Sequence, residues 1–145
     1  RVIEFNCRFG DPETQPIMMR LKSSLVDLVE AGIAGNLPTE AEWDERKTVG
    51  IVLASKGYPE TSSKDDVIYG LDTQMTDAKV FHAGTANNAN GDVVTAGGRV
   101  LCVTALGNTI GEAQAKALEL CQKVTFDGVQ YRKDIGYRAI ARENA

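Results

Sequence analysis

The apolar residues of this chain change their spacing once, and that change most constrains how the chain folds. Up to residue 38 they recur at intervals of three and four, the period of an amphipathic helix. From residue 48 onward they form short, nearly continuous runs, "TVGIVLAS" at 48–55 and "RVLCVTAL" at 99–106, which are typical of buried strands. The polar stretch "TEAEWDERK" at 39–47 separates the two patterns. We therefore predict two structural units, residues 1–38 and 39–145.

The first unit is predicted to be a strand followed by one helix. Residues 1–6 read as a strand whose successive side chains face opposite ways, and the turn sequence Gly10-Asp11-Pro12 ends it. Asp11 suits a helix N-cap and Pro12 suits the first helical position. The pattern then predicts a single helix from about Pro12 to Ala34, with an apolar face of Met18, Leu21, Leu25, Leu28, Val29 and Ile33.

The second unit is predicted to be a mainly antiparallel sheet with one packed helix. Besides the two buried runs, short strands are expected at 67–69 and 79–83, and Asn90-Gly91 is a strong hairpin signal. Thr109 and Glu112 have the spacing of a capping box. The helix that they open is expected to bury Ile110, Ala113, Ala117, Leu120, Cys121 and Val124. The predicted fold class of the whole chain is therefore α+β.

Composition and charge exclude several classes of protein. Hydrophobic residues make up 43% of the 145, enough to build a core. The net charge is −4, with 16 basic and 20 acidic residues interspersed, which argues against a nucleic-acid surface. No apolar run approaches a membrane span, and three cysteines without CxxC spacing favour a reducing, cytoplasmic compartment. Because the chain opens within an expected strand, we expect it to be a piece of a longer protein; the sequence does not indicate an oligomeric state.

The densest polar function lies in the opening stretch "EFNCRFGDPETQ" at residues 4–15. Glu4 and Asn6 share one strand face, about 7 Å apart at a rise of about 3.4 Å per residue. Both offer oxygen, the ligand that Mg²⁺ prefers, and Arg8 would add a forked cation for a phosphate on the same face. The alternative is a solvated polar face of a strand, and the spacing alone leaves both open.

The stretch also resembles a known family. The pattern E-x-N-x-R at a strand end is similar to the catalytic strand of ATP-grasp enzymes, and "RFGDPETQ" at residues 8–15 resembles the R-F-G-D-P-E-x-Q signature of the phosphoribosylamine–glycine ligases. Further segments resemble that family in order and spacing, namely "QPIMMRLKSSLVDL", "EWDER", "SKGYP", "KVFHAGT", "GGRVLCVTALG" and "RKDIGYRAI". The resemblance implies that residues 1–38 end an ATP-grasp domain and that 39–145 form the family's C-terminal domain.

The resemblance also implies an activity and its residues. The family joins glycine to 5-phosphoribosylamine in purine biosynthesis, with ATP as co-substrate and through a glycyl phosphate. By this likeness Glu4 and Asn6 would bind Mg²⁺ or Mn²⁺, and Arg8 would steady the transferring phosphoryl group. Asp11 and Glu13 would orient the glycine ammonium, although N-capping explains Asp11 equally well.

The C-terminal segment "RKDIGYR" at 132–138 is the expected phosphate site. A phosphate monoester needs two or more cations, and the resemblance implies that Lys133 and Arg138 bind the phosphate of 5-phosphoribosylamine. The alternatives are a basic surface tail or a pair between Asp134 and either cation.

Several other residues have simpler readings. His82 is expected to be structural, Gly97-Gly98 a turn, and the three cysteines core or incidental, because no histidine partner is evident. Two rival functions remain from the sequence: a related ATP-grasp carboxylase or formyl-transferring enzyme, and a non-catalytic domain that binds a phosphorylated ligand.

Overall fold

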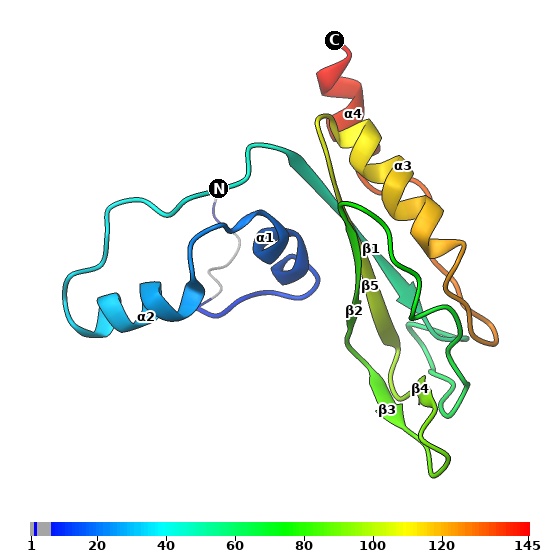
Figure 1. Cartoon of the computed structure of the whole chain (residues 1–145). Helices are drawn as coiled ribbons and strands as arrows, with labels where there is room; N and C mark the ends of the chain where they lie inside the picture. The colour runs from blue at the N-terminus through cyan, green and yellow to red at the C-terminus, as the bar shows by residue number, and fades with distance from the viewer. Residues whose placement is uncertain (1, 3–6) are drawn as a thin grey trace.

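The computed structural model describes residue 2 and residues 7–145 (Figure 1). Its elements are α1 (Thr14–Arg20), α2 (Leu25–Ile33), β1 (Lys47–Ala54), β2 (Ala78–His82), β3 (Thr85–Asn87), β4 (Val93–Thr95), β5 (Arg99–Gly107), α3 (Ile110–Cys121) and α4 (Tyr137–Glu143). The predicted α+β class, with antiparallel strands and a packed helix, is confirmed.

A three-stranded antiparallel sheet in the order β1-β5-β2 forms the centre of the fold. Its middle strand, β5, is the predicted run "RVLCVTAL" extended by one residue, and every residue from Val100 to Gly107 is buried. The other predicted run forms β1, which pairs with β5 from Lys47 opposite Gly107 onward. Both runs are almost continuously apolar because helices cover both faces of these strands.

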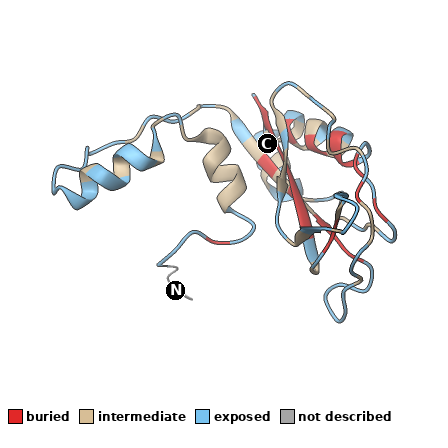
Figure 2. Cartoon of the chain, turned by 60° about the horizontal axis from the view of Figure 1, so that its bottom comes forward, coloured by how far each residue is buried: buried red, intermediate tan, exposed pale blue. Residues whose placement is uncertain are grey.

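The helix α3 covers one face of the sheet, against β1 and β5. Figure 2 shows the buried positions of α3 on the side that faces the strands. The predicted apolar face is confirmed at its centre, whereas Ile110 is half-buried and Val124 is buried beyond the end of the helix. The residues of α3 that are buried are Ala113, Ala117, Leu120 and Cys121.

Half of the predicted capping box forms at the start of α3. The backbone N–H of Glu112 donates to Thr109 Oγ1 at 3.1 Å, as a threonine N-cap requires. The Glu112 carboxylate accepts from the backbone N–H of Asn108 at 2.8 Å, one residue before the cap. The N–H of Ile110 donates to the Glu143 carboxylate of α4 at 2.8 Å, so α4 helps to cap α3.

The helix α1 lies against the opposite face of the same two strands (Figure 1). Pro16 is so close to Gly50 that a Cβ on that glycine would lie 2.9 Å from Pro16 Cγ. The side chain of Arg20 donates through Nε to the carbonyl of Asp44 at 2.9 Å. The sheet is thus sandwiched between α1 and α3, and glycine at position 50 allows the close approach of α1.

The single helix predicted from Pro12 to Ala34 is wrong. The chain leaves the helical conformation at Leu21, which is extended and forms a bridge with Trp43. A second helix, α2, then starts at a new N-cap, where Ser24 Oγ accepts from the backbone N–H of Asp27 at 3.3 Å. A contact with a residue 22 positions later in the chain therefore interrupts a pattern that is continuous in the sequence.

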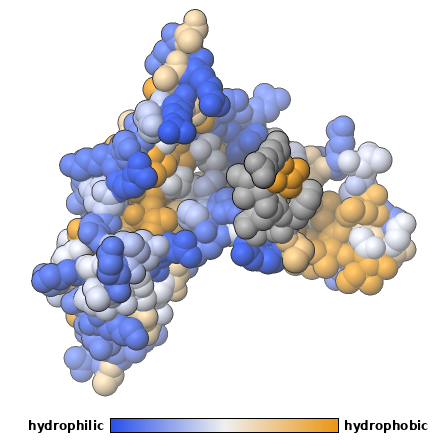
Figure 3. Space-filling model, turned by 180° about the vertical axis from the view of Figure 1, so that it is seen from behind, coloured by the Kyte–Doolittle hydropathy of each residue, from blue (hydrophilic) through white to orange (hydrophobic). Residues whose placement is uncertain are grey.

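The apolar face predicted for this region is nowhere fully buried: its first four residues are half-buried, and Val29 and Ile33 are exposed. Neither α1 nor α2 contains a fully buried residue. Figure 3 shows apolar side chains gathered at one end of the molecule, over α2. The exposed residues there are Val26, Val29, Ile33 and Leu37.

Three further predictions have different outcomes. The strand predicted at 67–69 is wrong, because Val67 and Tyr69 make only isolated bridges, to Val94 and Thr125. The hairpin at Asn90-Gly91 is confirmed, since it joins the paired strands β3 and β4. The strand predicted over residues 1–6 falls, apart from Val2, outside the described residues.

The described helices include none with the length and apolarity needed to cross a membrane.

Candidate functional site

The turn before α1 carries three of the predicted site residues. Gly10 is buried, and the Glu13 carboxylate lies over it, so that a Cβ on Gly10 would overlap Glu13 Oε1. The hydroxyl of Thr14 donates to the carbonyl of Gly10, which closes the turn. Arg8 is exposed, and its Nη1 donates to the carbonyl of the next residue at 3.3 Å. The guanidinium of Arg8 thus lies at the backbone of the following residue, and the carboxylate of Glu13 lies over Gly10.

Asp11 does not cap the helix. The N-cap of α1 is Glu13, without a side-chain capping bond. The Asp11 carboxylate instead pairs with Arg99 at the start of β5, with Oδ2 3.0 Å from Nη2. Nη1 of the same arginine donates to the backbone carbonyl of Asp11 at 3.4 Å. The N-cap prediction is therefore wrong, and the sequence contains no local signal that singles out Arg99, which directly follows Gly97-Gly98.

The ion pair of the C-terminal segment joins Arg132 and Asp134 and does not involve Lys133, a predicted phosphate ligand. Asp134 accepts from Arg132 through both carboxylate oxygens, at 2.9 and 2.7 Å. The guanidinium holds the pKa of the Asp134 carboxyl below its ordinary value. The alternative in which Asp134 pairs with Lys133 or Arg138 is therefore wrong for the described chain.

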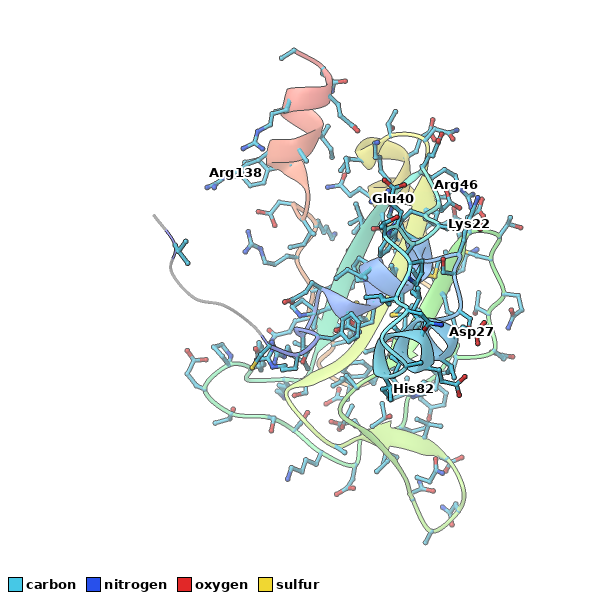
Figure 4. All side chains as sticks on the ribbon, turned by 90° about the vertical axis from the view of Figure 1, so that its left-hand side faces the viewer. Lys22, Asp27, Glu40, Arg46, His82 and Arg138 are labelled. Atoms are coloured by element: carbon cyan, nitrogen blue, oxygen red, sulfur yellow. The ribbon has the colours of Figure 1, made fainter. Side chains whose placement is uncertain are left out.

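Arg138 projects outward from the first turn of α4 (Figure 4). Its Nε donates to the Tyr137 hydroxyl at 2.9 Å, and its guanidinium lies 5.5 Å from the centre of that ring. The segment is anchored through its backbone, because the Gln114 side chain of α3 donates to the carbonyls of Lys133, at 3.4 Å, and of Ile135, at 2.7 Å. The charged ends of Lys133 and Arg138 are thus carried on a fixed backbone.

A cleft of about 340 Å³ lies beside this segment. Gln130 lines it and donates through Nε2 to the carbonyls of Ser55 at 3.0 Å and Tyr58 at 3.1 Å. These two hydrogen bonds hold the "SKGYP" loop next to the residues that directly precede "RKDIG". Its walls are Val52, Ala54, Tyr58, Gln130, Tyr131 and Arg132.

The predicted site residues fall into two groups. Arg8, Asp11 and Glu13 surround the turn before α1, and Lys133 and Arg138 belong to the C-terminal segment. No hydrogen bond or ion pair within residues 7–145 joins the two groups. The predicted metal ligands Glu4 and Asn6 lie outside the described residues, and residues 7–145 hold no cluster of three or more histidine, cysteine or acidic side chains suited to a metal.

His82 and the three cysteines, which were not expected to belong to a catalytic site, have the following surroundings. His82 is exposed, and its Nδ1 lies 3.1 Å from Thr85 Oγ1 (Figure 4). Cys102 and Cys121 are buried, and burial raises the pKa of both thiols, that of Cys121 to about 12. A thiol with so high a pKa is protonated at neutral pH and is a poor nucleophile. Cys7 is exposed.

Comparisons with known proteins agree on one family. The sequence model of the family described as "Phosphoribosylglycinamide synthetase, C domain" matches residues 48–138. Phosphoribosylamine–glycine ligase of Vibrio parahaemolyticus is 59% identical, and that of Pseudomonas aeruginosa 61%, each over 99% of this chain and 34% of the relative. A crystal structure of phosphoribosylamine–glycine ligase from Thermotoga maritima is 39% identical, with a TM-score of 0.76 over 92% of this chain and 33% of that one.

The chain spans about a third of the length of these relatives. The family match covers β1 through the first residues of α4, which is the sheet, its covering helix and the C-terminal segment. The chain therefore belongs to the phosphoribosylglycinamide synthetase C-domain family.

Proposed function

We propose that this chain is the C-terminal third of a cytoplasmic ATP-dependent ligase of purine biosynthesis. The enzyme would join glycine to 5-phosphoribosylamine and convert ATP to ADP and phosphate through a glycyl phosphate. The observation that carries the proposal is the identity of 59–61% to proteins named phosphoribosylamine–glycine ligase, over 99% of the chain. The two relatives and the solved structure described above all carry the name of this ligase, which favours it over the carboxylase and the non-catalytic alternatives.

The turn before α1 would act on the reacting groups. The exposed guanidinium of Arg8 would contact the transferring phosphoryl group, whose negative charge is spread over its three equatorial oxygens during transfer. The Asp11 carboxylate would accept hydrogen bonds from the glycine ammonium and so aim the glycine carboxylate at ATP. Glu13, folded over Gly10, would fix the turn and face the same ammonium.

The metal belongs to residues that precede this turn. Glu4 and Asn6 have the oxygen donors that suit Mg²⁺ or Mn²⁺, and they would hold it in the segment that precedes Arg8. When bound, the metal supplies positive charge to the phosphates. The division into residues 1–38, as the end of an ATP-grasp domain, and 39–145 remains a part of this proposal.

Lys133 and Arg138 would bind the phosphate of 5-phosphoribosylamine. That phosphate carries nearly two negative charges at neutral pH and must lie away from the phosphate that reacts. Placing its cations on the C-terminal segment meets this need. The anchoring of the segment through Gln114 supports the role, because a fixed backbone keeps both cations in place without substrate.

The test is an assay of ADP formation by the complete enzyme that contains this chain. We expect ADP to form only when both glycine and 5-phosphoribosylamine are present, and we expect no turnover by the 145 residues alone. Turnover that needs neither substrate would overturn the proposal.

The same assay tests the metal ligands. Glu4→Ala should reduce activity more than Asn6→Ala. The first change removes a negatively charged ligand of the metal, whereas the second removes a neutral amide. Near-normal activity of Glu4→Ala at ordinary Mg²⁺ concentration would show that the metal lies elsewhere.

A further inference from the structure

One ion pair joins the turn before α1 to the C-terminal sheet. Asp11 and Arg99 are 88 positions apart in the sequence. A single guanidinium holds Asp11 at two points, with Nη2 3.0 Å from the carboxylate Oδ2 and Nη1 donating to the backbone carbonyl at 3.4 Å. Because the side chain and the backbone are both held, Arg99 sets the position of Asp11 and also the direction of its carboxylate.

Arg99 itself stands on a rigid part of the sheet. It is the first residue of β5, the central strand, and its carbonyl accepts from the backbone N–H of Gly84 at 2.9 Å. The carbonyl of Gly98 accepts from the N–H of Ser55 at 2.9 Å. The Tyr58 ring packs on Gly98 so closely that a Cβ there would lie 2.5 Å from Cδ2. The base of the Arg99 side chain is thus fixed by neighbours on both sides, as a positioning group requires.

The exposure of the pair argues against a role in stability. The side chains of Arg99 and Asp11 are 43% and 52% exposed. Pairs this exposed contribute little to the free energy of unfolding, because water screens them and both side chains lose entropy. The two-point contact therefore restricts the orientation of Asp11 locally and contributes little to global stability.

We propose that Arg99 is a positioning residue of the ligase reaction, which orients the Asp11 carboxylate toward the glycine ammonium. The inference rests on the proposed function, in which Asp11 binds glycine. It assigns the sheet of the C-terminal domain a part in glycine binding, in addition to the phosphate role of the C-terminal segment. Without Arg99, the Asp11 carboxylate would be free to turn to solvent or to cap α1.

The test uses Arg99→Gln in the complete enzyme. We expect kcat/KM for glycine to fall about 10- to 100-fold, since misplacing a binding group by about 1 Å has effects of that size. The KM for ATP and the thermal midpoint Tm should stay near the parent values. Arg99→Lys should recover part of the loss, because it keeps the charge and lacks the fork that reaches both oxygens.

A matched control is available at the C-terminal end of α3, where Glu119 belongs to the helix and Lys123 follows it. Lys123 pairs with Glu119 at 3.0 Å, and these side chains are 44% and 57% exposed, nearly as in the Asp11–Arg99 pair. α3 covers the face of the sheet opposite to α1. Lys123→Gln should therefore leave kcat/KM for glycine unchanged. A loss equal to that of Arg99→Gln would mean that removal of any surface cation has this effect, and it would overturn the inference.

A double-mutant cycle completes the test. If Arg99 acts through Asp11, the double variant of Arg99→Gln and Asp11→Asn should be no worse than Asp11→Asn alone. Losses that multiply would overturn the inference, and so would a normal glycine KM and kcat in Arg99→Gln, or a fall in Tm that accounts for its lost activity. Failure of the proposed function is distinguishable, because the parent enzyme would then not require glycine.

Discussion

At the scale of single residues, Gly70 is the position least able to accept a side chain. Its φ of +83° is unfavourable for other residues, and a Cβ would lie 2.0 Å from the carbonyl oxygen of Lys123. Gly91, at the hairpin, has a similar φ of +87° and open space around it. The two glycines therefore separate the cost of the backbone conformation from the cost of steric overlap.

We expect Gly70→Ala to lower the free energy of unfolding by at least about 3 kcal/mol, and Gly91→Ala by about 1–2 kcal/mol. Both replacements place alanine in a left-handed backbone conformation that it disfavours, but only the first forces a side chain against the backbone. Urea denaturation of the two variants measures the difference. Equal losses would mean that the chain around Lys123 relaxes without cost.

Arg138 is the residue with the most specific predicted effect on activity. In the complete enzyme, Arg138→Ala should raise the KM for 5-phosphoribosylamine roughly 10- to 100-fold, because a charge-assisted hydrogen bond is worth about 1.5–3 kcal/mol. The KM for ATP and glycine should stay near the parent values, since the residue binds a remote group. Steady-state kinetics with each substrate varied in turn would measure this.

Arg142, in the last turn of the same helix, provides the control. Arg142→Ala removes an exposed cation from α4 and should leave all three KM values unchanged. An Arg138→Ala variant that loses ATP affinity and keeps that for 5-phosphoribosylamine would show that the C-terminal segment serves the nucleotide.

At the scale of elements, the N-cap of α3 is a testable local determinant of the fold. The hydroxyl of Thr109 accepts from the N–H of Glu112 at 3.1 Å, and α3 carries much of the core. Thr109→Ala should lower the free energy of unfolding by about 1 kcal/mol. Thr109→Ser should lower it by much less, because serine retains the hydroxyl that caps the helix. Denaturant midpoints of the two variants would show this, and equal midpoints would mean that the Glu143 contact caps the helix alone.

The break between α1 and α2 shows that apolar periodicity alone does not predict where a helix ends. The apolar spacing continues from Met18 through Leu21 to Leu25, as one helix would require. The backbone nevertheless turns at Leu21 to pair with Trp43, and the N–H of Lys22 donates to Glu42 at 2.9 Å. Hydrogen bonds to a distant segment replace those of the helix, and a local pattern contains no information about that segment.

At the scale of the whole molecule, one ion-pair network ties the polar stretch at 39–47 to the domain. Arg46 contacts Asp44 at 2.7 Å and Asp77 at 2.8 Å, and Asp77 also lies 3.4 Å from Lys116 of α3. The side-chain hydrogen bonds from Arg46 hold the pKa of both carboxyls below the ordinary value of 3.8. The network therefore makes stability depend on pH.

The sign follows from proton binding. In the unfolded chain these carboxyls bind protons at higher pH than in the folded chain, so their contribution is fully present above about pH 5. It is lost as the pH falls below the ordinary value and toward the lowered folded pKa values. We expect Arg46→Gln to flatten the decrease in stability between about pH 5 and pH 2, as measured by urea denaturation. Identical pH profiles of parent and variant would contradict the lowered pKa values.

The sequence by itself determined the elements that depend on local pattern. Continuous apolar runs predicted β1 and β5, the threonine cap and its apolar face predicted α3, and Asn90-Gly91 predicted the β3–β4 hairpin. Each of these is set by steric and hydrogen-bonding preferences within a few residues, or by the burial that an apolar run demands. The likeness to the ligase family was also readable from the residues, because its segments are short and ordered along the chain.

Only the tertiary structure decided which charged groups meet. Asp11 fits a helix N-cap in the sequence but pairs with Arg99, 88 positions away. The short helix α4 and the break at Leu21 likewise depend on neighbours that the fold supplies. The physical reason is that an ion pair or a strand bridge requires atoms within about 3–4 Å, and the order of residues along a chain sets that distance only for near neighbours.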